Sequence, residues 1–386
     1  MAEDSRGSRI FSDFNSAFNR DPDIDEFDII PILEPKQNRS PVVLIDHKLG
    51  LEHWCVRILY SYAYDRLMDW RTKHLGARSL DYGHVIELTR AVLAVNPDVA
   101  TAWNIRKETV QKGHLRVAQD FKFGALLLRK HPKSPETFCH RKWLFNHLMR
   151  TDPRFAPLNF DLDPLNIDAI NVQLAPSGNV GEMRLQIPSD VLNLVQEEMS
   201  VCQMAADRYP SNYNAWSHRI WVLQHVGKCD RQILLTELDQ TKEWVSLNIS
   251  DHSGFHYRQF VVRHLYPDHE SDEVDKTILE VELDDTTDLL KRYPEHESVW
   301  CHRRFIVEYL QSTSNHETRD GSPDREVTKK SRLDVEDDTN LDIIQRELEF
   351  CKKFINNSKK KSVKQQLALK YRTWLERTFM ECVDDL

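Results

Sequence analysis

The residues of this sequence that could do chemistry are arginines that recur in one local frame. A tryptophan or phenylalanine stands three residues before each arginine, a histidine or tyrosine usually stands one before it, and an aromatic residue usually stands two after it. The arginines are Arg106, Arg141, Arg219, Arg258 and Arg303. A guanidinium can bind carboxylates or phosphates through two parallel hydrogen bonds, and an imidazole can act as a base. Because the arginine and the histidine or tyrosine before it recur together so regularly, they do not indicate a single catalytic centre.

Two interpretations of the recurring pairs remain open. In one, each guanidinium is partly buried and ties neighbouring units together through carboxylates or carbonyl groups. In the other, a row of these side chains faces a partner protein on the inner surface. The candidate partner-binding residues are His140, Arg141, Tyr213, His218, Arg219, Tyr257, Arg258, His302 and Arg303.

The aromatic residue of each frame is predicted to belong to the core. It shares one helix face with the arginine that follows it three residues later. Truncating such an aromatic residue should cost ~3–5 kcal/mol of stability. The predicted structural residues of the repeats are Trp103, Arg106, Phe138, Trp216, Phe255 and Trp300.

The frame recurs with a period of roughly 35–45 residues, which is typical of an array of one supersecondary unit. In the first unit, the apolar residues of Tyr82–Val95 have helical spacing, and Asn96-Pro97 ends that helix because proline cannot continue it. A second helix then carries Trp103 and Arg106. The later pairs are Val117–Lys130 with Thr137–Met149, Val191–Arg208 with Tyr213–His225, Leu234–Leu247 with Gly254–Leu265, Ile278–Arg292 with Ser298–Leu310, and Leu341–Phe354 with Val363–Phe379. We therefore expect an all-α fold of about six helical hairpins, with no strand of useful length.

The domain organisation follows from composition. Residues 1–41 are polar, acidic and rich in proline, and are expected to form a flexible arm. The helical-hairpin repeat domain is expected to span 42–386, with a capping helix from about His47 to His74. Two stretches interrupt the repeats and are expected to be insertions, at about 151–188 and at about 312–340.

Composition also excludes several classes of function. The 386 residues are 40% hydrophobic and 29% charged, with 52 Lys+Arg against 61 Asp+Glu, a net charge of −9. This balance disfavours a nucleic-acid partner, because such proteins usually carry a basic face. The sequence has no signal-peptide pattern and no apolar run long enough to span a bilayer, so we expect a cytoplasmic protein.

No self-contained active site is visible. The sequence has no P-loop, no dinucleotide fingerprint, no H-E-x-x-H and no G-x-S-x-G. His252 and His256 have helical spacing but lack a nearby third ligand, and the cysteines show no metal-ligand spacing. We expect neither a metal nor a cofactor in this chain.

At the repeated residues the sequence resembles the α subunits of heterodimeric protein prenyltransferases, whose repeats read approximately N-P-x-x-x-x-x-W-x-x-R. Asn96–Arg106 reads N-P-D-V-A-T-A-W-N-I-R, and Asn212–Trp221 reads N-Y-N-A-W-S-H-R-I-W. The resemblance covers about Asp81–Leu310 and, more weakly, the final pair. The motif order is most similar to Rab geranylgeranyltransferase α subunits, and the insertions are similar to those of a third type of protein geranylgeranyltransferase.

The resemblance implies a right-handed α–α superhelix, a crescent solenoid wrapped around a separate β subunit. The implied partner is the Rab geranylgeranyltransferase β subunit, which would hold the zinc and the geranylgeranyl diphosphate. This chain would be the non-zinc subunit, inactive alone, and would help to select the acceptor. The implied acceptor is a protein with C-terminal cysteines, such as an already farnesylated SNARE.

The resemblance also implies a supporting catalytic role for Lys133. In the family, an α-subunit lysine eight residues before a repeat arginine helps to stabilise the leaving diphosphate. Lys133 has this position relative to Arg141, in H-P-K-S-P-E-T-F-C-H-R. Pro135 and Phe138 stand where the family usually has a tyrosine and a tryptophan. The alternative for Lys133 is a solvated lysine at a helix start, and the alternative for the whole chain is a non-enzymatic scaffold that kept this fold.

Overall fold

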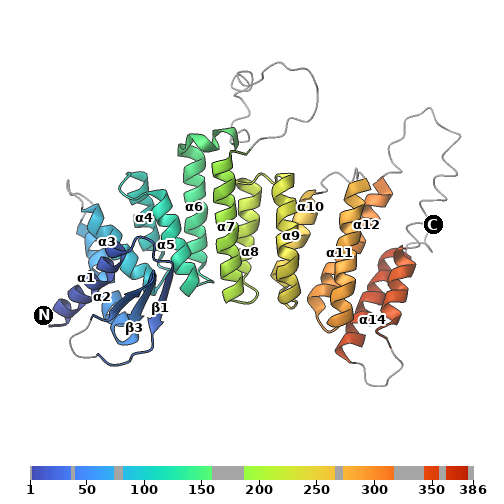
Figure 1. Cartoon of the computed structure of the whole chain (residues 1–386), viewed down its shortest axis with the longest axis horizontal. Coiled ribbons are helices and arrows are strands. Elements are labelled where there is room, and N and C mark those ends of the chain that lie inside the picture. The colour runs from blue at the N-terminus through green and yellow to red at the C-terminus, as the bar shows by residue number, and fades with distance from the viewer. Residues whose placement is uncertain are drawn as a thin grey trace, which may run out of the picture. The chain divides into compact units, whose positions relative to one another are not determined.

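Helical hairpins make up most of the described chain (Figure 1). The computed structural model describes residues 2–35, 40–73, 81–158, 187–265, 273–316, 343–355 and 362–380. The chain divides into two compact units, Met1–Lys228 and Cys229–Leu386.

The hairpins of the first unit follow the predicted boundaries closely. They pair α3 (Tyr82–Val95) with α4 (Ala100–Gln111), α5 (Val117–Lys130) with α6 (Pro135–Thr151), and α7 (Ser189–Arg208) with α8 (Tyr213–His225). Side chains cap several of these helices: Asp81 accepts a hydrogen bond from the backbone of α3, Ser134 from α6 and Asn212 from α8. Each cap satisfies a backbone N–H that the first turn of a helix leaves free.

The second unit repeats the same construction. It pairs α9 (Arg231–Leu247) with α10 (His252–Leu265), α11 (Glu273–Arg292) with α12 (Glu297–His316), and a helix over 343–352 with α14 (Val363–Leu375). A short π-helical segment, η4 (Glu376–Met380), continues α14. The helices of the α9/α10 and α11/α12 pairs pack on each other, as do α10 and α12. The predicted helical-hairpin architecture is therefore confirmed.

The N-terminal segment differs from the prediction. Residues 1–41, expected to be a flexible arm, contain α1 (Ala2–Arg20) and β1 (Glu26–Ile30). The helix α1 packs on α2 (His53–Lys73) and buries Ile10, Phe11 and Phe14. These apolar residues have the spacing of one helix face. The prediction missed this spacing because it relied on the acidic and proline-rich composition of the whole segment.

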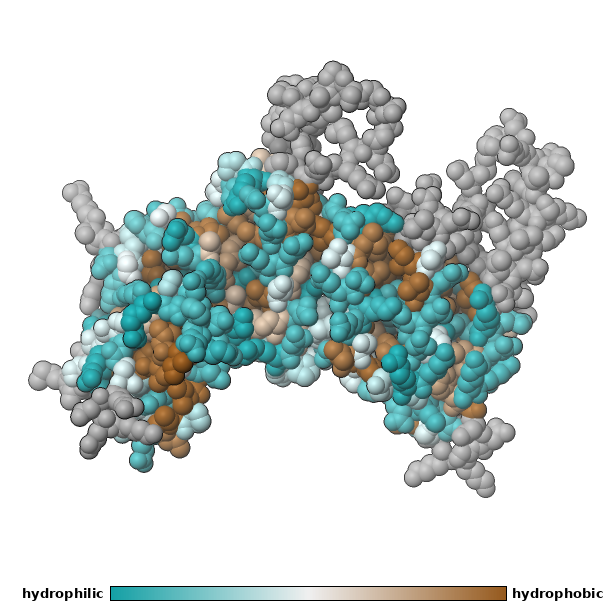
Figure 2. All heavy atoms as spheres, viewed as in Figure 1, coloured by the Kyte–Doolittle hydropathy of each residue, from teal (hydrophilic) through white to brown (hydrophobic). Residues whose placement is uncertain are grey.

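A small three-stranded sheet adjoins α1, although the sequence was expected to contain no useful strand. The strand order is β1–β3–β2, with β3 (Lys48–Glu52) parallel to β1 and antiparallel to β2 (Val42–Ile45). Asp46 and His47 both have positive φ and form the two-residue turn between β2 and β3. The predicted capping helix therefore begins at α2 rather than at His47. Figure 2 shows an apolar patch over this part of the molecule.

The predicted insertions lie largely outside the described residues. The 3₁₀ helix η1 (Pro153–Leu158) follows α6 at the start of the first insertion and buries Phe155 and Leu158. The rest of that stretch up to residue 186, and the second insertion beyond His316, are outside the described chain. No helix in the described part of the chain is both long and apolar enough to cross a membrane.

Candidate functional site

Buried carboxylates bind the repeated arginines and histidines to one another. In the first unit, Arg141 Nε donates to Glu198 Oε1 at 2.7 Å, and its Nη2 also contacts the carboxylate. His218 Nε2 lies 2.7 Å from the same Oε1. Because Arg141 is on α6, Glu198 on α7 and His218 on α8, one carboxylate joins two successive hairpins.

The same arrangement recurs around other acids. Asp120 contacts Arg106 and His140, each at 2.7 Å. In the second unit, Glu282 contacts Arg258 and His302, Glu347 contacts Arg303 and Tyr371, and Glu237 accepts from Tyr257. The acid lies twenty residues before the histidine or tyrosine for Asp120, Glu198, Glu237 and Glu282. Sequence reasoning missed these acids, although this constant offset is a signal that could have found them.

The remaining arginine N–H groups are also bonded in a regular way. Arg258 and Arg303 each donate to a backbone carbonyl twenty residues earlier and to a threonine hydroxyl seventeen residues earlier, Thr241 and Thr286 respectively. Arg141 makes the carbonyl bond to Phe121, and Gly124 occupies the position of the threonine. A Cβ on Gly124 would lie 3.1 Å from Arg141 Nη1, so the glycine leaves room for the guanidinium.

Electrostatics fixes the charge state of each acid. Burial raises the pKa of Glu198, but Arg141 and the hydrogen bond from His218 outweigh it and hold the pKa at about 2. Asp120 and Glu282 also have a pKa of about 2, because an arginine and a histidine overcome the effect of burial in the same way. The acids are therefore ionised, and each is neutralised by its arginine.

The histidines are neutral hydrogen-bond donors. Burial lowers the pKa of His140, His218 and His302 below the usual range, although the neighbouring acid acts in the opposite direction. A neutral imidazole beside an ionised carboxylate must carry its proton on Nε2. A tyrosine hydroxyl is also a neutral donor, which explains why Tyr257 and Tyr371 replace histidine in this position. These histidines are placed to bind an acid, not to act as bases.

The burial of these residues corrects the predicted partner-binding surface. Most of the proposed residues are at most 3% exposed: His140, Arg141, His218, Arg219, Tyr257, Arg258, His302 and Arg303. Side chains this deep, which donate hydrogen bonds to groups of the same chain, do not present themselves to another protein. Tyr213 differs, because its side chain is 73% exposed at the start of α8. Of the two interpretations, the structure supports guanidinium groups that tie neighbouring helices together.

The aromatic residues of the frame lie beside this network. Trp103, Phe138, Trp216, Phe255 and Trp300 are all buried, as is Arg106. The indole Nε1 of Trp103 donates to the carbonyl of Pro97 at 2.7 Å, and that of Trp300 donates to Pro294 at 3.0 Å. In these two frames a hydrogen bond across the helix start therefore links the tryptophan to the proline six residues before it.

One group of residues in the described chain has the composition of a metal site but not its charge balance. Ligand atoms of Glu198, Cys202 and His218 lie within 4.8 Å of one another. Both carboxylate oxygens of Glu198 already contact Arg141. A zinc site needs free ligands around the ion, usually four in a structural site. These residues do not fit a zinc ion.

Lys133 lies in a different environment from the repeated arginines. Its side chain is exposed just before α6, and its Nζ lies 4.2 Å from the ring centre of Tyr209. The backbone carbonyl of Lys133 accepts a hydrogen bond from Asn214 at 2.8 Å, and that of Pro132 accepts one from Asn212 at 2.7 Å. These bonds anchor the segment before α6 to the start of α8. We call Lys133, Tyr209 and Asn214 the Lys133 patch.

Among the frames of Arg106, Arg141, Arg219, Arg258 and Arg303, only that of Arg141 has a cation at the position of Lys133; in the final, partial frame Lys364 lies eight residues before Arg372 and is also exposed. The equivalent residues, eight before the other arginines, are Asp98, Ser211, Ser250 and Glu295. Pro135 is the first residue of α6, where its missing N–H costs no helical hydrogen bond. The difference from the family at Pro135 is therefore compatible with the helix that follows Lys133.

The comparisons with known proteins agree with this construction. The family model of the protein prenyltransferase alpha subunit repeat matches residues 117–148, 195–226, 234–265 and 279–310. These ranges cover most of α5/α6, α7/α8, α9/α10 and α11/α12. The class that the fold and the matched repeats define is a helical-hairpin protein of the prenyltransferase α-subunit type, which has an α–α superhelical fold.

Curated relatives carry the same repeats. The chain is 45% identical over 260 residues to the human protein prenyltransferase alpha subunit repeat-containing protein 1, covering 67% of this chain and 58% of that protein. It is 43% identical over 261 residues to the protein of that name from Danio rerio, covering 67% and 55%. It is also 27% identical over 197 residues to the geranylgeranyl transferase type-2 subunit alpha of Sus scrofa, covering 46% and 33%.

These matches show that the chain contains protein prenyltransferase alpha subunit repeats and is similar to the proteins named after them. The chain spans little more than half the length of the relatives named repeat-containing protein 1. The predicted resemblance to this family, and the more distant similarity to the Rab geranylgeranyltransferase α subunit, are confirmed.

Proposed function

We propose that the chain is the α subunit of a heterodimeric protein geranylgeranyltransferase. The observation that carries the proposal is the Lys133 patch, where an exposed cation eight residues before Arg141 lies over the ring of Tyr209. The matched α-subunit repeats and the similarity to a geranylgeranyl transferase type-2 subunit alpha support the same function. The proposed partner is the type-2, or Rab, β subunit, with the pair acting in the cytoplasm.

In this proposal the β subunit holds the cofactors, because Glu198, Cys202 and His218, which form the candidate metal cluster of the described residues, do not fit a zinc ion. Zinc would lower the pKa of the acceptor cysteine so that its thiolate forms, and geranylgeranyl diphosphate would supply the prenyl group. Lys133 would place its ammonium group beside the diphosphate, which gathers negative charge as its bond to the prenyl group breaks. Tyr209 would keep the ammonium group oriented through the contact of its ring with Nζ.

The proposed acceptor is a protein with one or two cysteines near its C-terminus, including an already farnesylated SNARE. The repeated arginines and histidines are buried, so acceptor selection would fall to exposed residues. Tyr213 is one such residue, since it is exposed and directly precedes Asn214 of the Lys133 patch.

Assembly and transfer test the proposal together. The chain would be co-expressed with the type-2 β subunit, and the product would be sized by gel filtration with mass measurement. We expect a 1:1 complex that transfers labelled geranylgeranyl to a prenylated or unprenylated acceptor cysteine, while the chain alone transfers none. A chain that stays folded without binding any prenyltransferase β subunit would contradict the proposal and favour a scaffold. A stable complex without transfer to any cysteine acceptor would contradict the enzymatic role.

A further inference from the structure

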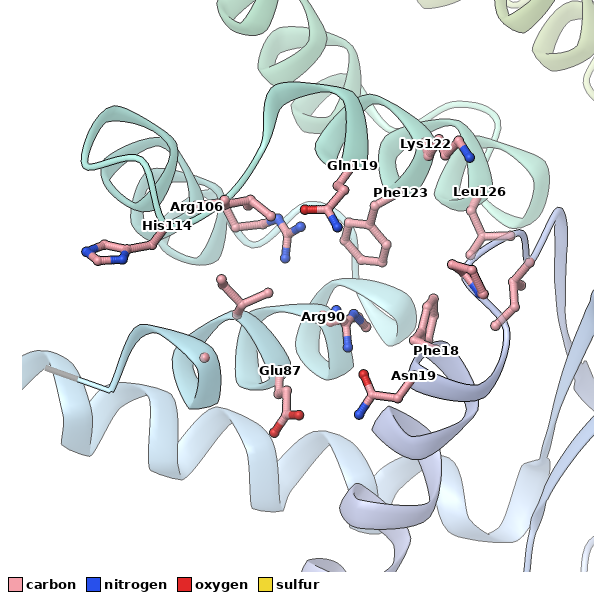
Figure 3. Close-up of a pocket in the computed structure, with 15 residues that line it drawn as sticks. Phe18, Asn19, Glu87, Arg90, Arg106, His114, Gln119, Lys122, Phe123 and Leu126 are labelled. Atoms are coloured by element: carbon pink, nitrogen blue, oxygen red, sulfur yellow. The ribbon is translucent and has the colours of Figure 1, made fainter.

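A cavity in the first unit lies apart from the Lys133 patch. It has a volume of about 350 Å³ and opens between α1, α3 and α5 (Figure 3). Phe18 of α1, Ile86 of α3 and Phe123 and Leu126 of α5 give it apolar walls. Arg90 of α3 and Arg106 of α4 also line the cavity with their guanidinium groups. Asn19, Glu87, His114, Gln119 and Lys122 also line the cavity, so its walls combine apolar surface with polar and charged groups. Apolar walls with polar groups that fix the orientation of a ligand are typical of a small-molecule site.

Arg90 differs from the arginines of the repeat network. Its Nη1 donates to Asn15 Oδ1 at 3.0 Å, and its guanidinium carbon lies 4.7 Å from the ring centre of Phe18. Within the described part of the chain, no carboxylate forms an ion pair with it. Arg106, beside it in the cavity, is neutralised by Asp120. Arg90 therefore brings a positive charge into the cavity without a matching negative one.

The surroundings of Arg90 destabilise the charged form of its guanidinium group. Burial and the nearby positive charge of Arg106 lower the pKa of Arg90 to about 10, so the group stays cationic at neutral pH. An arginine with most of its N–H groups free is suited to a planar or tetrahedral oxyanion, to which it can donate two parallel hydrogen bonds. The amide of Gln119 also lines the cavity and offers a further donor (Figure 3).

The other charged groups at the cavity do not remove this preference. Glu87 lies one helical turn before Arg90 on α3 and is 3.9 Å from His84. Lys122 stands at the rim and forms an exposed ion pair with Asp23 at 3.0 Å. Neither pair supplies the acid that Arg90 lacks, and Glu87 is expected to weaken anion binding to some extent.

We propose that this cavity binds a small molecule that carries a carboxylate or phosphate group on an apolar body. The anionic group would accept hydrogen bonds from Arg90, and the apolar body would pack against Phe18, Phe123 and Leu126. The cavity is built from α1 and the first hairpins, and α1 lies outside the matched repeats. The proposal does not depend on the role of Lys133 or on a β subunit.

Calorimetric titration of the full chain tests this inference with three probes of similar size. Benzoate carries a carboxylate, phenyl phosphate carries a phosphate, and benzamide is the neutral control. We expect at least one of the anions to bind at one site and ~10-fold or more tighter than benzamide, since a hydrogen bond to a charged group contributes ~1.5–3 kcal/mol. The stronger anion identifies which of the two chemistries the cavity accepts.

Substitutions assign the binding to Arg90. R90Q should weaken the anion ~10- to 100-fold and leave benzamide unchanged. K122Q is the matched control, because it removes an exposed rim cation, and should change affinity by less than ~threefold. E87Q should tighten anion binding, which provides a second variant if R90Q does not fold. Anions that bind no better than benzamide would overturn the proposal, as would tight anion binding that survives R90Q or an affinity that E87Q lowers.

Discussion

Helix α6 brings together the two kinds of cation that this protein uses. Arg141 lies within the helix, is buried, and is neutralised by Glu198 of the next hairpin. Lys133 lies just before the helix, is exposed, and has an aromatic ring rather than a carboxylate beside it. The arginine recurs throughout the array, whereas a lysine eight residues before it is found only at Lys133 and, in the final partial frame, at Lys364. The comparison teaches that the recurring charges hold the hairpins together, whereas Lys133, which takes no part in that network, is the residue to which we assign the proposed function.

The largest expected effect comes from removing a recurring charge. R141M should lower the free energy of unfolding by ~3–5 kcal/mol, because it leaves Glu198 as a buried charge with only His218 to bind it. Urea unfolding followed by circular dichroism measures the change. The double substitution R141M/E198Q should restore part of the loss, since it removes the uncompensated charge.

An exposed arginine of the same helix is the matched control. Arg150 lies in the last turn of α6 and is exposed. R150M should change the stability by no more than about 0.5 kcal/mol. If R141M and R150M had equal effects, the claim that the recurring arginines are structural would be wrong.

Acidification should weaken the recurring network. His140, His218 and His302 have a pKa below the usual range, so the unfolded chain takes up protons first and stability falls as the pH drops through about 6.5. The pKa of Asp120, Glu198 and Glu282 is about 2, so their contribution is present above pH ~4 and is lost as the pH falls toward 2, by ~2–3 kcal/mol for each acid.

Thermal unfolding at a series of pH values measures this dependence. H302Y introduces the donor that the chain itself uses at Tyr257 and Tyr371, and should flatten the curve between pH 7 and pH 5. Stability that stays constant or rises on acidification from pH 7 would contradict the assigned charge states.

A smaller effect is expected from the hydroxyl groups that complete the network. Thr286 accepts a hydrogen bond from Arg303 Nη1 at 2.8 Å and is buried. T286V should therefore cost ~1 kcal/mol or somewhat more, because it removes one acceptor of a charged donor. T236V is the control, since Thr236 Oγ1 bonds only its own helix, at Gln232. If urea unfolding showed the same loss in the free energy of unfolding for both variants, the claim that the Thr286 hydroxyl contributes to the network would be wrong.

The helices were predictable because their signals are local. Tyr82–Val95, Val117–Lys130 and Tyr213–His225 were predicted with the boundaries that α3, α5 and α8 have. Proline, a capping side chain and apolar spacing act within a few residues of each helix end, so the sequence alone places them. The aromatic residue of each frame lies in the core for the same reason, since its spacing from the arginine fixes the helix face.

The missed features depend on residues far apart in the sequence. The partner of Arg141 is Glu198, in a helix beyond the first predicted insertion. The strands β1 and β3 are short and parallel, so their pairing needs residues on either side of β2. The cavity at Arg90 requires α1, and α1 was not predicted because the composition of residues 1–41 indicated a flexible arm. None of these contacts has a signal within one helix or one turn.

The transfer rate of complexes that carry Lys133 variants tests the central claim most directly. K133A would be compared with wild type and with K112A, at equal amounts of complex with the type-2 β subunit. Lys112 is the matched control because it is exposed and its Nζ also lies over a tyrosine ring, that of Tyr82, at 5.3 Å. We expect K133A to assemble normally but to transfer geranylgeranyl ~10-fold or more slowly, because the cation that stabilises the leaving diphosphate is removed. K112A should transfer at the wild-type rate. Equal rates for all three complexes would contradict the assignment of the proposed function to Lys133.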